Sequence, residues 1–263
     1  MPILLLLALL LLTHSASSSI AFHQNGHLYQ IDHAKLAVKK GSTIVSAKCS
    51  DGVLLLVISN EKRTVLQMPT EPKHKITKSL YMVATGYSFD ATALLNTVRA
   101  VATDYRSTFS EDISVQYLCE VLAKPIHDRT KKSGRRLMAT EAVFVECDCF
   151  QGRWTDNPTT KYKIFKIDVD GSFRGYKSLC IGGKYSNDIM EKMSEIESAV
   201  PLETSTVQTV LKSISPLILD IFNGGVGKND IFTLRESFDV KCYKGSADQS
   251  TGILHWDEIE KTP

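Results

Sequence analysis

One hairpin constrains the fold of this chain more than any other feature. Residues 43–48 begin Thr-Ile-Val, Ser50-Asp51-Gly52 is a tight-turn signal, and residues 53–58 are apolar at every position. A strand that is apolar throughout is typically buried on both faces. The sheet that contains this hairpin must therefore be covered on both sides, which predicts a layered fold.

The remaining predicted elements come in blocks. Helices are expected in two pairs, at residues 90–109, 114–131, 187–199 and 205–223, and Pro125 and Pro216 should kink or interrupt two of them. Strands are expected at residues 138–150, 161–170, 172–181 and 230–243, with a strand pair at 75–84 and a hairpin turn at Asp170-Gly171. Helices segregated from hairpins indicate two antiparallel sheets between two helix layers.

Composition is that of an ordinary globular protein, with 43% hydrophobic and 23% charged residues. The net charge of +2 gives no reason to expect a nucleic-acid partner. Six cysteines include the pair Cys147-x-Cys149, which a strand would point to one face; we interpret all six as buried thiols rather than a zinc site. The even count would permit disulfides in a secreted protein. No motif predicts a metal or another cofactor.

Both ends of the chain differ in character from the middle. The apolar run at residues 3–12 is shorter than the ~20 residues that span a bilayer, so no membrane span is predicted. Small residues follow it, as in a secretory signal peptide, although the leading Lys or Arg is missing. Residues 1–19 are therefore either a signal peptide or a divergent tail. Residues 246–263 are expected to form a polar tail with a short helical piece at 257–261.

A turn, a short helix and a stop are predicted ahead of the hairpin. Asn25-Gly26 is a turn signal, and Gly41 is a helix stop just before the first strand. Between them, apolar residues recur at helical spacing, at Leu28, Ile31, Ala34 (or His33) and Ala37 or Val38.

This segment resembles the N-terminal signature of proteasome α-type subunits. The match is carried by Gly26, Leu28, Tyr29, Gln30, Ile31, Asp32, His33 and Ala34, and it continues through Thr85-Gly86 and Phe89-Asp90-Ala91. It covers about residues 20–245, which we take as one α-type domain. The resemblance implies an α+β fold of the N-terminal-nucleophile hydrolase type, a four-layer αββα sandwich of two antiparallel sheets between helix pairs.

The same resemblance implies a function. α-Type subunits are non-catalytic members of the 20S proteasome core, found in the cytoplasm and nucleus. Seven form an outer ring with other α and β subunits as partners, and the signature helix packs against neighbours. The chain ahead of this helix gates substrate entry. A lysine, here Lys73 or Lys75, receives the C-terminal tail of a regulatory particle, and an ammonium is a suitable donor to that carboxylate.

Comparison with the catalytic β-type relatives predicts no active site. Ser42, after Gly41, falls at the position of their nucleophile, Gly86 at that of an oxyanion donor, and Ile58 at that of their aspartate. Such a nucleophile needs its own free α-amine as base, whereas about 40 residues precede Ser42 here. A peptidase that uses Ser42 after cleavage is thus a less favoured alternative.

The gate is where this chain departs from the family. Its early Tyr-Asp pair, its proline and its helix tyrosine are replaced by Ser15, Ala16, Gln24 and His33. Histidine at that last position can change charge near neutral pH. A second alternative follows from these departures and from the leader. The chain would then be a secreted or organellar paralogue that acts as a non-catalytic binding protein.

Overall fold

The computed structural model describes residues 22–59, 66, 71–131, 135–149, 160–199, 201–223, 239–248 and 253–259. The leader at 1–19 and the first part of the strand predicted at 230–243 lie outside these residues.

Ten strands form two antiparallel sheets in the described part of the chain. The first has the order β10-β9-β2-β1-β8, with β10 Leu254–Glu258, β9 Asp239–Ala247, β2 Gly52–Ser59, β1 Thr43–Cys49 and β8 Ser178–Ile181. The second has the order β3-β4-β5-β6-β7, with β3 Lys73–Lys75, β4 Leu80–Gly86, β5 Thr140–Cys149, β6 Thr160–Ile167 and β7 Phe173–Tyr176.

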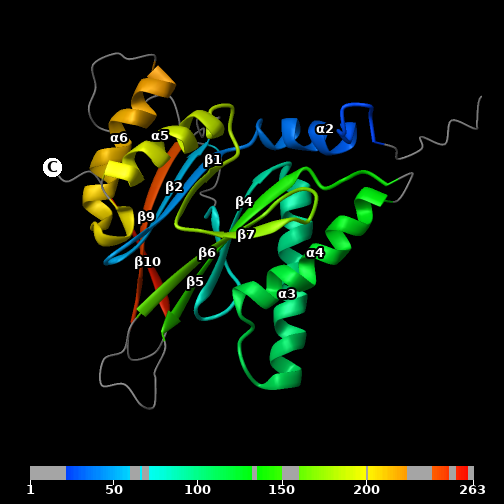
Figure 1. Cartoon of the computed structure of the whole chain (residues 1–263). Coiled ribbons are helices and arrows are strands. Elements are labelled where there is room, and N and C mark those ends of the chain that lie inside the picture. The colour runs from blue at the N-terminus through cyan, green and yellow to red at the C-terminus, as the bar shows by residue number, and fades with distance from the viewer. Residues whose placement is uncertain are drawn as a thin grey trace, which may run out of the picture.

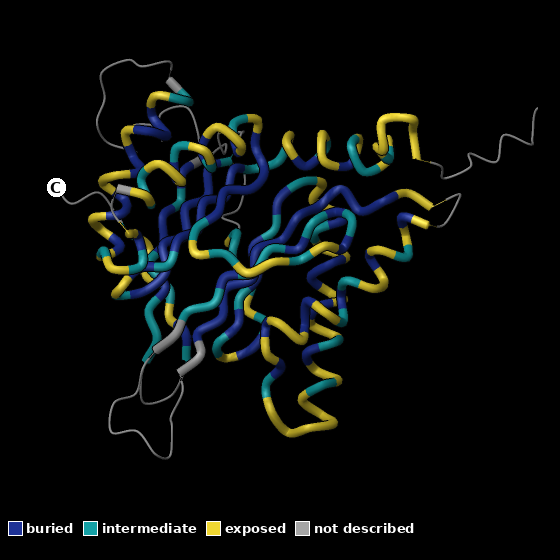
Figure 2. Tube along the Cα trace, in the orientation of Figure 1, coloured by how far each residue is buried: buried dark blue, intermediate teal, exposed yellow. Residues whose placement is uncertain are grey.

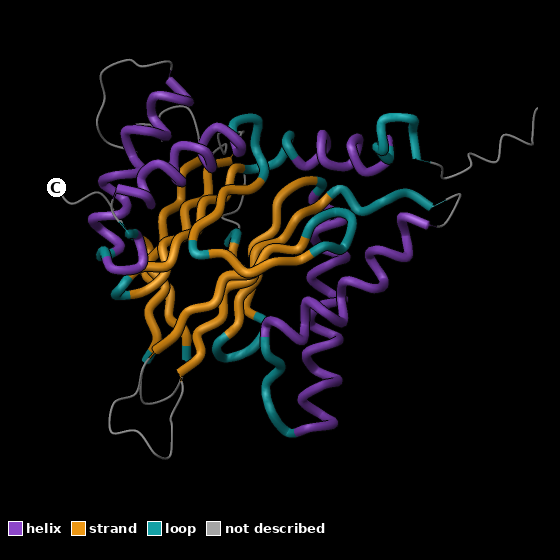
Figure 3. Tube along the Cα trace, in the orientation of Figure 1, coloured by secondary structure: helices purple, strands orange, loops and turns teal. Residues whose placement is uncertain are grey.

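The helices cover the two outer faces of the sheets (Figure 1). On the first sheet lie α5, Ser186–Ala199, and α6, Val207–Asn223, joined by a short 3-10 turn at Leu202–Thr204. On the second lie α3, Ser88–Phe109, and α4, Val115–Lys131. A further helix, α2 at Tyr29–Val38, lies across one end of the sheets. The predicted four-layer αββα sandwich is confirmed (Figure 3).

Strand alternation along β2 explains why three apolar layers form. Leu54, Leu56 and Ile58 point into the cluster under α5 and α6, while Val53 and Leu55 point into the cluster between the sheets. All of them are fully buried, as the dark-blue strands of Figure 2 show. A third cluster joins the second sheet to α3 and α4. The predicted burial of this strand on both faces is therefore confirmed.

Two local predictions were wrong. Residues 172–181 form two strands, β7 and β8, which belong to different sheets. The helical piece expected at 257–261 does not start at 257, because Leu254–Glu258 is strand β10 and pairs with β9; residues 260 and 261 lie outside the described residues. The helices α4 and α6 continue past Pro125 and Pro216, so Pro125 does not interrupt α4, and the kinks expected at the two prolines stay a prediction.

The helix predicted before the hairpin is confirmed, and α2 is held by a small apolar cluster of its own. Ala34 and Val38 are buried against Leu137 and Val169, with Ile31 packed beside them. The opposite side of α2 faces outward, and Leu36 there is 59% exposed. The helix therefore closes the end of the sandwich with one face and presents the other.

Glycines bring the backbones close together where α2 enters β1. Gly182 adopts φ +65°, and a Cβ there would overlap the Ser42 carbonyl oxygen. A Cβ on Gly41 would overlap the backbone nitrogen of Gly86. This end of the sandwich can close only because these positions lack side chains.

We expect Gly182→Ala to lower the free energy of unfolding by about 3 kcal/mol, because it combines a left-handed backbone with a backbone clash. Denaturant unfolding of the purified chain measures this. Gly175→Ala is the control, since its Cβ would meet Phe165 at 3.5 Å without strain, and it should change stability by less than about 0.5 kcal/mol. Equal losses in both variants would contradict this account.

Candidate functional site

The signature residues predicted to make ring contacts all lie on α2 or the turn before it. Gly26 has φ +77°, and its N–H donates to the His23 carbonyl at 2.8 Å, which closes the turn. Ala34 is buried, and Leu28, Ile31 and Asp32 are half-buried. The other signature side chains, those of Tyr29, Gln30 and His33, are exposed and free to contact a partner.

Aromatic rings gather at the start of α2. The Tyr29 ring lies 5.0 Å from that of His23 and 6.4 Å from that of His33, measured between centroids. His27 Nδ1 lies 3.6 Å from Asp32 Oδ2. Tyr29 remains 56% exposed. Together with Leu36 it gives α2 an outward face, which we call the α2 contact face and define as Tyr29, Gln30, His33 and Leu36.

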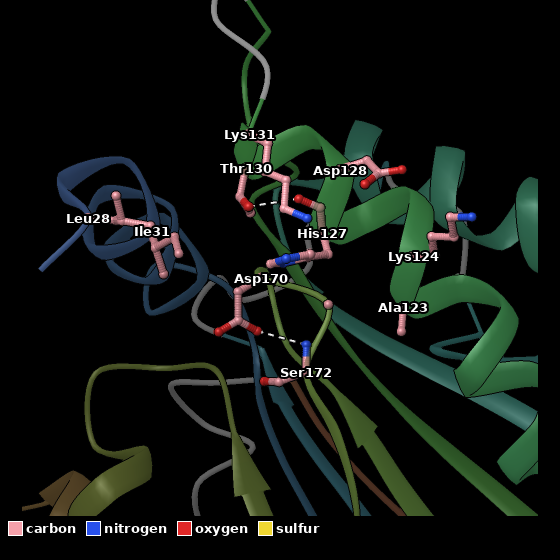
Figure 4. A pocket seen from close by; sticks show the side chains of 11 residues that line it. Leu28, Ile31, Ala123, Lys124, His127, Asp128, Thr130, Lys131, Asp170 and Ser172 are labelled. Carbon is pink, nitrogen blue, oxygen red and sulfur yellow. Dashed lines mark hydrogen bonds between the residues drawn. The ribbon is translucent and has the colours of Figure 1, made fainter. Parts of the chain in front are cut away.

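A pocket of about 580 Å³ separates the start of α2 from α4 (Figure 4). Leu28 and Ile31 form one wall, and His127 and Thr130 lie opposite. The β6–β7 turn closes the bottom, where the backbone N–H of Ser172 donates to Asp170 Oδ1 at 2.8 Å. The predicted Asp170-Gly171 turn is confirmed, with φ +85° at Gly171, but nothing in the sequence indicated that it lies next to α2.

A second pocket, of about 520 Å³, lies beneath α2 and is lined by charges. Lys166 Nζ lies 2.7 Å from Asp168 Oδ1 and 3.3 Å from Glu141 Oε2. Burial raises the pKa of Glu141 to about 7, an effect that Lys166 opposes and Asp168 reinforces. Burial alone would lower the pKa of Lys166. The carboxylates of Glu141 and Asp168 outweigh this effect, so that the pKa of Lys166 is raised. Sequence analysis missed this cluster.

At the nucleophile position, Ser42 contacts a serine and a threonine among the described residues. Ser42 Oγ lies 3.4 Å from Ser59 Oγ, and the Ser42 carbonyl accepts a 2.6 Å hydrogen bond from Thr85 Oγ1. Ile58 is fully buried under α5 and α6. Glu141 pairs directly across from Thr85 on the neighbouring strand, so the charged cluster lies at the same end of the sandwich as Ser42.

The two candidate docking lysines lie on β3, the edge strand of the second sheet. Lys73 forms an ion pair with Glu71, and its Nζ sits 4.0 Å from the centroid of the Tyr243 ring. Lys75 is exposed. Strand alternation puts both lysines on the same side of β3, next to β9 and β10 rather than beside Ser42.

The described residues include no group of three His, Cys, Asp or Glu side chains that could hold a metal ion. Five cysteines are buried and form no disulfide: Cys49, Cys119, Cys147, Cys180 and Cys242. Burial raises the pKa of Cys49 and of Cys119 to about 12, so these thiols are poor nucleophiles. Within the described part, every helix is too short or too polar to cross a bilayer.

Comparison with known proteins gives the family. Residues 38–225 match the family model of the proteasome subunit, and the chain belongs to this family. It is a divergent α-type subunit. It is 25% identical over 247 residues to proteasome subunit alpha type-7-like of Macaca fascicularis, covering 91% of this chain and 90% of that one.

Two further relatives extend this picture across distant organisms. Proteasome subunit alpha type-3 of Saccharomyces cerevisiae is 26% identical over 263 residues, covering 93% of this chain and 95% of the relative. Proteasome subunit alpha of Methanosphaerula palustris is 28% identical over 162 residues, covering 61% and 63%. The resemblance inferred from the signature is confirmed.

Asp90 fixes the segment on which α2 rests. Its carboxylate accepts two 2.7 Å hydrogen bonds from the Arg136 guanidinium and one of 2.8 Å from the backbone N–H of Ala139. Leu137, which packs against α2, lies between these two residues. The Arg136 hydrogen bonds lower the pKa of Asp90, against the effect of burial.

We expect Asp90→Asn to lower the free energy of unfolding by about 1–3 kcal/mol at pH 7, because the amide cannot accept both guanidinium bonds. The lowered pKa means that the carboxylate stabilises the fold above about pH 4 and that this stabilisation is lost as the pH falls. The difference from wild type should therefore shrink towards pH 3.

Denaturant unfolding at pH 7 and pH 3 makes this measurement. Asp104→Asn is the matched control, because Asp104 is an exposed residue of the same helix. A loss of stability that is equally large at both pH values would show that the carboxylate's charge is not its source.

Proposed function

We propose that this chain is a structural subunit of a 20S proteasome core and contributes to its outer ring through the α2 contact face. The observation that carries the proposal is the placement of α2. One side of the helix is buried against Leu137 and Val169, while Tyr29 and Leu36 on the other are more than half exposed. Exposed large apolar side chains on a rigid helix fit a protein contact. Membership of the proteasome subunit family supplies the partners, which are other α and β subunits.

Gating and docking are further parts of the proposal. The gate would be formed by the chain ahead of α2, where Ser15 and Ala16 lie outside the described residues and Gln24 lies in the turn before the helix. Regulatory-particle tails would bind at Lys73 or Lys75. We take residues 20–245 as the α-type domain and place the protein in the cytoplasm and nucleus, in line with the family.

The chain acts in this proposal without catalysis of its own. The Ser42 nitrogen is bonded to Gly41, whose N–H donates to the Val38 carbonyl at 2.9 Å as α2 ends. Freeing that amine would require cleavage of the Gly41–Ser42 peptide bond, which would separate α2 from β1. The side chain at the aspartate position, Ile58, is apolar and faces the helices. These features favour a structural role over a peptidase that uses Ser42.

We expect Leu36→Asp to reduce incorporation into proteasome cores at least tenfold, because it places a charge in an apolar contact. The measurement is affinity purification of the tagged full chain, followed by quantification of co-purifying proteasome subunits. Ser194→Asp, on the exposed side of α5, is the matched control and should leave recovery unchanged.

Recovery of no proteasome subunit with the wild-type chain would contradict the proposed function. The intact mass of the recovered chain separates the alternatives. A chain that begins at Ser42 would favour the peptidase, and one that begins between residues 17 and 20 would favour a secreted or organellar binding protein.

The docking lysines give a separate expectation. Replacing both Lys73 and Lys75 by Ala should weaken binding of a regulatory-particle tail peptide at least tenfold, since a carboxylate loses its charged partner. Fluorescence anisotropy with the assembled core measures this, and the single variants assign the effect. Lys78→Ala, in the adjoining loop, is the control. Unchanged affinity in the double variant would rule out this docking site.

A further inference from the structure

Three charged side chains share the space directly beneath α2. The side chains of Glu141, Lys166 and Asp168 are 10%, 19% and 23% exposed. Lys166 contacts both carboxylates, at 3.3 Å and 2.7 Å. When all three are ionised, two negative charges share one positive charge, and the cluster carries a net negative charge inside the protein.

The helix α2 forms one side of this space, along the flank between its buried side and its outward side. Its residues Asp32, Lys35, Leu36, Val38 and Lys39 line the same pocket as the cluster. The other walls are the end of β8 with Cys180 and Gly182, and the start of α5 with Ser186 and Asn187. We call α2 seated when it packs against Leu137 and Val169. Part of the burial of Glu141 therefore depends on α2 being seated.

Burial of a carboxylate favours its protonated form, because the charged form loses its hydration. This is the main reason why the pKa of Glu141 is raised from 4.5 to about 7. Lifting α2 would admit water to Glu141 and return its pKa towards the ordinary value. Seating α2 is then accompanied by uptake of a proton whenever the pH lies between these two values.

We propose that the seating of α2 is coupled to protonation of the Glu141–Lys166–Asp168 cluster, so that α2 is held most firmly in acid and loosens as the pH rises to neutrality. The direction follows from linkage: a group that binds its proton more tightly in the seated state stabilises that state at low pH and ceases to do so as its proton leaves. The consequence for the ring rests on the proposed function, in which α2 makes the contact.

Other charged groups near α2 must be separated from this effect. Asp32, Lys35 and Lys39 of α2 face the pocket, as does the buried thiol of Cys180. Histidines change charge in the same pH range, and His23, His27 and His33 lie exposed at the start of α2. The pH profile of the wild-type chain alone therefore does not identify Glu141, and a variant is needed.

Hydrogen exchange of the full chain tests the coupling at pH 5.5 and pH 7.5. After correction for intrinsic exchange rates, we expect the protection of α2 amides to fall by up to about twentyfold between these pH values in the wild type. In Glu141→Gln, which stays neutral, this fall should largely disappear. Protection within α3 serves as an internal reference and should change equally in both proteins.

Glu146→Gln is the matched control, because Glu146 is another buried glutamate of β5 with a lysine neighbour, Lys163, at 3.6 Å. It should keep the wild-type response of α2. Asp168→Asn is a second variant should Glu141→Gln fail to fold. Asp168 raises the pKa of Glu141, so its loss should move the transition to lower pH.

An α2 response that is the same in Glu141→Gln and in the wild type would overturn the proposal, as would a wild type without any response. The measurement uses the isolated chain and does not depend on assembly. Failure to recover proteasome subunits would contradict the proposed function but would leave this result unaffected.

Discussion

Burial of β2 on both faces is the constraint on which the rest of the structure depends. Its apolar side chains are removed from water in two directions, towards α5 and α6 and towards the second sheet. Each fully buried Leu, Ile or Val contributes about 1.5–3 kcal/mol, so neither cover could be lost without a large cost. The second sheet has an apolar outer face in turn, and α3 and α4 cover it. The helix α2 then closes one end of the sandwich.

Local patterns were enough for the elements whose packing they encode. The hairpin at β1 and β2, the four long helices and the short helix α2 were all predicted from apolar spacing and turn residues. The split of residues 172–181 was not, because it depends on which distant strand each half meets. Phe173 pairs with Ile167, while Ile181 pairs with Ile44. Pairing also overrides local preference at β10, where Trp256 packs against Gly245 and the ring of Tyr81.

The candidate site divides in the same way. The signature on α2 is contiguous in sequence and was found by resemblance, and counting placed Ile58 at the aspartate position. Counting residues from the Asp51-Gly52 turn did not show that the Ile58 side chain faces α5 and α6. That orientation follows from the alternation of side chains along β2. The charged cluster could not be predicted, because Glu141 and Lys166 become neighbours only through the register of β5 and β6. Burial raises the pKa of Glu141, and a separate segment, α2, lines part of the pocket in which it lies.

The split at residue 177 has a mechanical consequence. β7 is the edge strand of one sheet and β8 that of the other, and Lys177 alone joins them. The backbone therefore links the two sheets covalently at this edge. The Lys177 carbonyl also accepts a hydrogen bond from the N–H of Lys48 in β1. At the far edge, β10 contacts the β3–β4 loop through the Leu254 N–H, which donates to the Lys78 carbonyl, and contacts β4 through the rings of Trp256 and Tyr81. Moving the sheets apart at the β7–β8 edge would require the backbone at Lys177 to stretch, whereas moving them apart beside β10 requires these non-covalent contacts to break.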